Sequence, residues 1–89
     1  MIQRKAVNIT KDEVIKLQWD WSAELERRDT TLSSSAWRST DSVVTISATS
    51  ISGNKTLATL TASHDPQGSI INTAVLANGE TLVAGAYYE

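Results

Sequence analysis

Apolar and polar residues alternate strictly in the segment that begins at Val14. One side of the alternation carries Ile15, Leu17, Trp19 and Trp21, and the other carries Lys16, Gln18 and Asp20. A period of two over this stretch predicts a β-strand with one face in the core and the other in water. At the end of the strand we expect the indole N–H of Trp21 to reach a backbone carbonyl.

Size and composition favour a small β-domain. The 89 residues, rich in Ser and Thr and without cysteine, predict one domain over residues 1–89, in which residues 1–10 form a flexible or edge-strand arm. No apolar run is long enough for a signal peptide or a membrane span. We therefore expect the chain to be made and kept in the cytoplasm, or to leave it as part of something larger, with no membrane partner. The formal net charge of −2 argues against nucleic-acid binding.

Two irregular stretches follow the first strand. Residues 22–28 contain Ala, Glu, Leu and Arg, which favour a short helix, with Ser22 as its N-cap and Leu25 pointing inward. Farther along, Leu32 and Trp37 are an odd number of residues apart, so a regular strand would place them on opposite faces. A β-bulge in residues 33–35 would bring both side chains into the core.

The rest of the chain predicts two hairpins. Its extended segments are residues 43–51, 56–62, 70–77 and 80–88. A loop around Gly53 closes the first pair, a type I turn is expected at residues 65–68, and Asn78-Gly79 predicts a type I′ turn in the second pair. About seven strands at this spacing predict an all-β fold, an immunoglobulin-like antiparallel β-sandwich without the disulfide and with one short helix near residues 22–28. A small barrel is the alternative.

The residues offer little chemistry for catalysis or metal binding. His64, the one histidine, lies beside Asp65 in a predicted turn, where we expect it to be loop surface. No nucleophile-elbow, phosphate-loop or zinc-protease motif occurs. We therefore expect no enzymatic activity, no cofactor and no metal site.

Six residues are candidates for an interface with another protein: Arg27, Arg28, Ile70, Leu76, Tyr87 and Tyr88. Both faces of the strand over residues 70–77 carry aliphatic side chains, which fits either a central strand or a strand with one face against a partner. Adjacent tyrosines in a strand point to opposite faces, so one is expected outside, where a C-terminal edge strand can pair with a neighbour. The two arginines either contact an acidic partner or form a solvated helix end.

The three tryptophans also leave two alternatives open. Trp19 and Trp21 share the apolar face of the first strand, which favours a place in the core for them and for Trp37. Exposed in a line, the three indoles would instead form a platform for sugars.

A spaced set of residues runs through the first half of the chain: Lys11-Asp12-Glu13-Val14, Asp20-Trp21-Ser22, Leu25, Asp29-Thr30, Ser34-Ser35 and Trp37. With Leu32 and the final hairpin over residues 70–81, this pattern resembles that of small bacteriophage virion proteins, the phage fiber-tail adaptor family. The similarity covers residues 11–85. The chain departs from the family pattern at residues 38–40, Arg-Ser-Thr, where the family has apolar residues.

The resemblance implies an immunoglobulin-like sandwich and a structural, non-enzymatic role in the tail or neck of a phage or prophage particle. It also implies partners among other phage tail or fiber proteins, with a homo-oligomeric ring as one assembly. The implied location is the virion, after assembly in the cytoplasm of the bacterial host. The alternative function is that of a carbohydrate-binding β-sandwich module with exposed aromatic residues.

Overall fold

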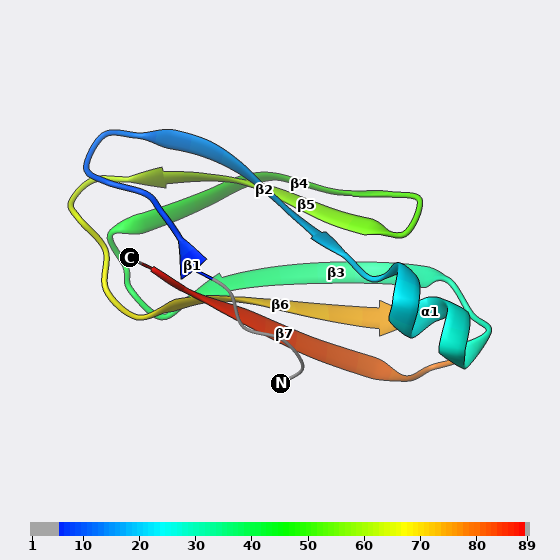
Figure 1. Cartoon of the computed structure of the whole chain (residues 1–89). Coiled ribbons are helices and arrows are strands. Elements are labelled where there is room, and N and C mark those ends of the chain that lie inside the picture. The colour runs from blue at the N-terminus through cyan, green and yellow to red at the C-terminus, as the bar shows by residue number, and fades with distance from the viewer. Residues whose placement is uncertain (1–5, 89) are drawn as a thin grey trace.

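The computed structural model describes residues 6–88, so residues 1–5 of the expected arm lie outside the described part (Figure 1). This part forms two sheets with one short helix at an end of the sandwich. The elements in chain order are β1 (Ala6–Val7), β2 (Val14–Asp20), α1 (Ser22–Arg28), β3 (Leu32–Ser39), β4 (Val44–Ser52), β5 (Lys55–Ala62), β6 (Ser69–Leu76) and β7 (Thr81–Tyr88).

The strand order is that of an immunoglobulin-like sandwich. One sheet has the order β1-β7-β6-β3 and the other the order β2-β5-β4. The pairs are antiparallel, except that β1 runs parallel to the end of β7. The predicted sandwich of seven strands with a helix at residues 22–28 is thus confirmed, and the chain does not close into the alternative barrel.

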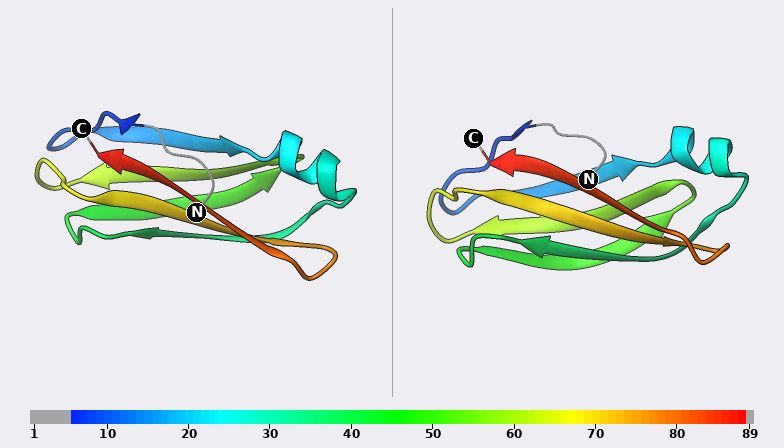
Figure 2. Two further views of the ribbon diagram at one scale, coloured as in Figure 1. Left: turned by 60° about the horizontal axis from the view of Figure 1, so that its bottom comes forward. Right: turned by 90° about the horizontal axis from the view of Figure 1, so that it is seen from below.

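The core lies between the inner faces of the two sheets (Figure 2). The alternation predicted for β2 is confirmed, because Leu17, Trp19 and Trp21 are buried while the residues between them are exposed. The ring centroids of Trp19 and Trp21 are 6.0 Å apart. Trp37 is partly buried and packs against the same core.

The edge strands β3 and β4, one from each sheet, are both irregular. The register of β3 against β6 shifts between Leu32 and Ser34, which confirms the predicted bulge, and both Leu32 and Trp37 pack against the core. The sequence did not predict a second irregularity in β4, between Ser47 and Ser50. There Ala48 has a φ of 49°, in the left-handed region.

The helix α1 begins differently from the prediction. Trp21 is its N-cap, without a side-chain cap, and Ser22 is the first helical residue. The N–H and hydroxyl of Ser22 both donate to the carboxylate of Asp20, so an acceptor two residues upstream takes over the capping. The helix ends at Arg28, and Asp29 follows it as the C-cap with a left-handed φ of 52°. The N–H of Asp29 bonds to Glu26 O, and the left-handed turn brings the next N–H, that of Thr30, back to Leu25 O. Leu25 is buried, as predicted.

The two predicted hairpins are confirmed, but two of the predicted turns have a different conformation. In the loop between β6 and β7, positive φ occurs at Gly79 and not at Asn78, with Gly79 N–H bonded to Leu76 O at 3.0 Å. A three-residue loop with a left-handed glycine therefore replaces the predicted type I′ turn. Residues 65–67 have no regular structure, and the prediction of a type I turn there is wrong. Gln67 N–H instead donates to Asp41, so a contact with a distant loop shapes this connection.

Candidate functional site

The outer side of the sheet β1-β7-β6-β3 carries aliphatic and small residues at its centre. We call its outward residues on β3, β6 and β7 the apolar face: Ser34, Ala36, Arg38, Ser69, Ile71, Thr73, Val75, Thr81, Val83, Gly85 and Tyr87. Seen from below, β7, β6 and β3 lie side by side, with no other described strand or helix in front of them (Figure 2, right). This face is the strongest candidate for a contact surface in the described residues.

The central row of the apolar face shows how the register builds it. On β6, Ile71 pairs with Arg38 on one side and Gly85 on the other, and Thr73 pairs with Ala36 and Val83. Ile71 is 8% exposed although it points away from the core cluster. Gly85 is buried as well, so the accessible part of this face lies at the half-buried Val75 and Val83 and at the exposed Tyr87.

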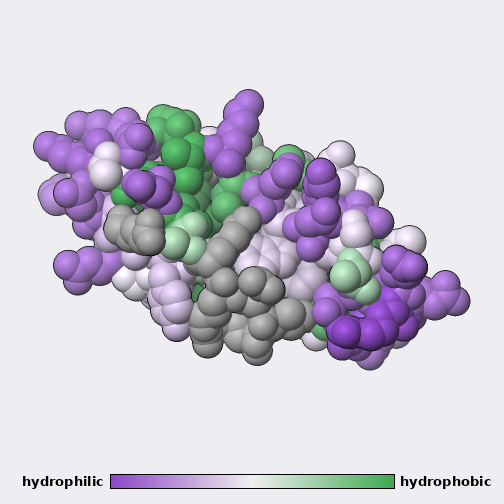
Figure 3. All heavy atoms as spheres, in the orientation of Figure 1, coloured by the Kyte–Doolittle hydropathy of each residue, from purple (hydrophilic) through white to green (hydrophobic). Residues whose placement is uncertain are grey.

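The outer side of the other sheet has a different composition. We call its outward residues on β2, β5 and β4 the polar face: Val14, Lys16, Gln18, Asp20, Lys55, Leu57, Thr59, Thr61, Thr45, Ser47, Ser50 and Ser52. Hydroxyl and charged groups dominate it, with Val14 and Leu57 as its aliphatic members. Val14 is 65% exposed, and hydrophobic atoms gather around the start of β2 in Figure 3. Apart from these aliphatic residues, the polar face is hydrophilic.

The structure corrects two of the predicted interface residues. Ile70 and Leu76 point into the core and are each 1% exposed, so neither can meet a partner while the sandwich is intact. The strand does carry aliphatic side chains on both faces, as the sequence indicated, but Ile71 and Val75 are the outward ones. No local signal separates the two sets, because alternation alone does not say which side of a strand faces the second sheet.

The two terminal tyrosines point to opposite sides, as predicted. Tyr87 is 52% exposed at the end of the apolar face, whereas Tyr88 is buried. The Tyr88 hydroxyl and Ser39 Oγ lie 2.7 Å apart in a hydrogen bond between β7 and β3. Burial raises the pKa of Tyr88 above its ordinary value, and the hydrogen bond to Ser39 opposes this rise. Tyr88 is thus part of the sandwich interior, and its prediction as an interface residue is wrong.

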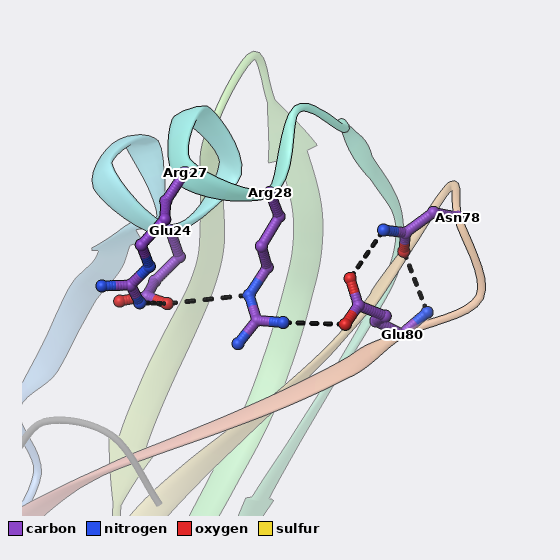
Figure 4. Close-up of polar contacts among 5 residues, drawn as sticks. All are labelled: Glu24, Arg27, Arg28, Asn78 and Glu80. Carbon is purple, nitrogen blue, oxygen red and sulfur yellow. Dashed lines mark hydrogen bonds and ion pairs between the residues drawn. The ribbon is translucent and has the colours of Figure 1, made fainter.

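Arg28 mainly fastens the helix to the body of the protein (Figure 4). Its Nη1 lies 2.8 Å from Glu80 Oε2 in the loop between β6 and β7, and its Nε lies 3.8 Å from Glu24 Oε2. Asn78 Nδ2 donates to Glu80 Oε1 at 2.6 Å, which holds this carboxylate in place. Arg27 is more exposed and pairs with Glu24 on its own helix. An acidic partner would therefore compete with existing ion pairs at both arginines.

A buried polar cluster joins the two sheets beside the tryptophans. Trp21 Nε1–H donates to Thr56 Oγ1 at 3.2 Å and to Asn72 Oδ1 at 3.1 Å. Thr56 Oγ1 also donates to Asn72 Oδ1, and Asn72 Nδ2 donates to Ser35 Oγ and Ala36 O. The prediction that Trp21 reaches a backbone carbonyl is wrong, since side-chain oxygens accept its proton. With Trp19 and Trp21 buried, these indoles supply no platform for a sugar.

The remaining polar features of the described residues lie at or near the surface. His64 is exposed, with Ser63 as its hydrogen-bond neighbour. Between residues 6 and 88, no group of three or more His, Cys, Asp or Glu is placed to hold a metal ion. An open hollow of about 350 Å³ lies between α1 and the β4–β5 turn, lined by Ser22, Leu25, Glu26, Asp29, Thr30 and Asn54.

The described part of the chain contains no helix with the length and apolar character needed to cross a membrane.

No protein-family model and no curated protein sequence matches this chain.

Proposed function

We propose that this chain is a structural, non-enzymatic component of a phage or prophage particle, in the tail or neck, which adapts fibers or neighbouring tail proteins through protein–protein contacts. The resemblance of residues 11–85 to the fiber-tail adaptor family suggests this role, and the immunoglobulin-like sandwich is the fold that the resemblance implies. The observation that carries the proposal is the apolar face, because the half-buried Val75 and Val83 and the exposed Tyr87 leave apolar surface there that gains free energy when another protein covers it.

The proposed mechanism is assembly by docking. Hydrogen-bonded strands hold the apolar face rigid, so little conformational entropy is lost when a partner binds. The ion pair of Arg28 with Glu80 links α1 to the β6–β7 loop at the end of the molecule next to this face. A small domain has a limited core, and contacts with other subunits add to its stability.

The proposed setting follows from the same role. The partners are other phage tail or fiber proteins and further copies of the chain, in a ring or a smaller assembly, with no nucleic-acid or membrane partner. The protein is assembled in the cytoplasm of the bacterial host and ends in the virion.

Particles of the phage or prophage that encodes the chain provide the test. Mass spectrometry of purified particles is expected to detect the chain at a fixed copy number, and a deletion is expected to give particles without attached fibers or tails. Val83→Lys on the apolar face should fail to restore assembly, whereas Thr45→Lys on the polar face should restore it. Intact, infective particles that lack the chain would overturn the proposal, and so would sugar binding that Tyr87→Ala abolishes in a chain absent from particles.

A further inference from the structure

We propose that the free edge of β2 pairs with β2 of a second copy of this chain, antiparallel and about a two-fold axis at Gln18, so that two three-stranded sheets join into one. The inference rests on the proposed function, in which further copies of the chain are among the partners, and it deepens that function by naming the strand through which two copies meet. The hydrogen-bonding direction, the regularity and the charges of β2 support it.

The backbone of β2 presents hydrogen-bonding groups at the edge of its sheet. β2 is the outermost strand in the order β2-β5-β4 (Figure 2, left). At one end of the strand Glu13 O accepts an N–H from the end of β5 at 3.3 Å, and at the other end Trp21 N–H donates into the β4–β5 loop at 2.9 Å. In the unbroken antiparallel register, the odd-numbered residues of β2 therefore bond to β5. The N–H and C=O groups that point to the free edge, where another strand can bond to them, belong to Val14, Lys16, Gln18 and Asp20.

β2 is more regular than the other edge strands of the described residues. Its seven residues pair with β5 without a register shift. The edge strands β3 and β4 each contain a bulge, and β1 has only two residues. Bulges and short strands hinder pairing with another chain. β2 is therefore the edge strand best suited to accept a further strand.

The exposed side chains along this edge are complementary in charge to themselves. Lys16, Gln18 and Asp20 are positive, neutral and negative in chain order, and an antiparallel second copy presents them in the reverse order. With the axis at Gln18, each Lys16 lies directly opposite Asp20 of the second copy, and opposite charges at such positions favour pairing. Both hydrogen bonds that Asp20 accepts from Ser22 end at Oδ1, so Oδ2 can accept the lysine of the second copy.

Charge also selects this register among those that the backbone permits. The groups at the free edge belong to even-numbered residues, so only even-numbered residues of the two copies can bond to each other. An axis at Lys16 or at Asp20 places like charges opposite each other, and an axis at Leu17 places each lysine opposite Gln18. The axis at Gln18 pairs each charge with its opposite. This match of β2 with itself favours a second copy over an unrelated strand.

The inward side of the paired strands is apolar. There Leu17 of one copy lies opposite Trp19 of the other, and no charged residue of β2 points to this side. Val14, which is 65% exposed at the start of β2, comes beside the first residue of α1 of the second copy. A single pair of edge strands gives a small interface, so we expect a weak dimer with a Kd on the order of 100 µM.

Sedimentation equilibrium of the full chain from about 10 µM to about 1 mM tests the inference, and the wild type should dimerise over this range. Lys16→Glu places a like charge opposite Asp20 of the second copy at both ends of the pair and should raise Kd by at least about tenfold. Arg38→Glu makes the same change of charge at an exposed position of β3 and should leave Kd unchanged. The double variant Lys16→Glu/Asp20→Lys reverses both charges and should restore dimerisation, with circular dichroism checking that each variant is folded.

Two results of this experiment would overturn the inference. One is a wild type that stays monomeric to about 1 mM, and the other is an equal effect of Lys16→Glu and Arg38→Glu on Kd. Monomeric wild type that is still found in particles would refute the pairing of β2 and leave the proposed function standing. A chain that dimerises through β2 but is absent from particles would support the pairing and contradict the proposed function.

Cysteine substitutions give a second measurement that changes no charge. The chain has no cysteine of its own, so Gln18→Cys and Thr45→Cys each carry a single thiol at an exposed position of an edge strand. Opposite residues in a hydrogen-bonded antiparallel pair have Cα atoms about 5.5 Å apart, which a disulfide can span. Gln18→Cys should therefore form a disulfide-linked dimer on mild oxidation several-fold faster than Thr45→Cys. Equal rates of crosslinking would contradict an axis at Gln18, even if the double charge reversal failed to fold.

Discussion

The indole N–H of Trp21 donates to Asn72 Oδ1, 3.1 Å away, and so joins the end of β2 to the middle of β6 across the sandwich. In antibody domains, a disulfide connects the two strands at these places in the fold. This chain has no cysteine, and a hydrogen-bonded cluster of Trp21, Thr56 and Asn72 links the sheets there instead. Each side-chain N–H and O–H of the cluster has an acceptor, so burying these polar groups leaves no donor without a hydrogen bond.

Asn72→Ala is expected to lower the free energy of unfolding by about 2–4 kcal/mol, because Trp21 Nε1–H and Thr56 Oγ1–H lose an acceptor inside the core. Asn72 is 1% exposed, so water cannot replace the lost partner. Urea unfolding followed by tryptophan fluorescence measures the change. Gln18→Ala, an exposed position on β2, is the control and should change stability by less than about 0.5 kcal/mol. A loss for Asn72→Ala no larger than that of the control would show that the cluster contributes little.

Alkaline pH is expected to destabilise the fold through Tyr88. Its pKa lies above the ordinary 10.0 because burial disfavours the charged phenolate. The contribution to stability is fully present below the unfolded pKa and is lost as pH rises through the folded pKa. Unfolding measured between pH 8 and pH 11 should show a fall above about pH 10 that is smaller in Tyr88→Phe. Identical pH profiles for the two proteins would exclude Tyr88 as the cause.

Acidic pH is expected to destabilise the fold through Asp41. Its carboxylate accepts N–H bonds from Gln67 and Val43, and these bonds hold its pKa below the ordinary 3.8. Its contribution to stability is therefore present above pH 3.8 and is lost as pH falls through the folded pKa. Asp41→Asn keeps one acceptor oxygen for two N–H groups, so it should unfold more easily at pH 6 and approach the wild type near pH 2. A constant gap between the two proteins from pH 6 to pH 2 would contradict this role.

The ion pair of Arg28 with Glu80 is expected to couple α1 to the β6–β7 loop only modestly. Both side chains are partly exposed, and pairs of this kind contribute about 0.5 kcal/mol. A double-mutant cycle with Arg28→Gln and Glu80→Gln should give that coupling at low salt and less of it at 1 M salt. A coupling energy above about 2 kcal/mol, or one that salt leaves unchanged, would mean that the pair is effectively buried.

Ala48→Gly is expected to stabilise the protein by about 0.5–1 kcal/mol. The φ of 49° at Ala48 lies in the left-handed region, where the methyl group of alanine is strained and glycine is not. Thermal and urea unfolding would measure the gain. Ala23→Gly on the exposed side of α1 is the matched control, and it should lose about 1 kcal/mol because glycine disfavours a regular helix. If both substitutions destabilise equally, the left-handed backbone at Ala48 is not strained.

Local patterns in the sequence determined the elements of this protein. The period of two places Leu17, Trp19 and Trp21 on one face because successive side chains of a strand point to opposite sides. The odd spacing of Leu32 and Trp37 predicted the bulge in β3 for the same reason. Seven such strands have few ways to bury their apolar faces, and a sandwich is one of them.

Tertiary structure alone decided which side of each strand faces inward and which groups satisfy one another. The residues of β6 are aliphatic on both faces, so only packing against the second sheet sends Ile70 and Leu76 inward and leaves Ile71 and Val75 on the apolar face. The acceptors of Trp21 come from strands 35 and 51 residues away, a distance over which local propensity carries no information. The sequence alone therefore could not identify the candidate contact surface, because the register between neighbouring strands determines which residues lie together on one face.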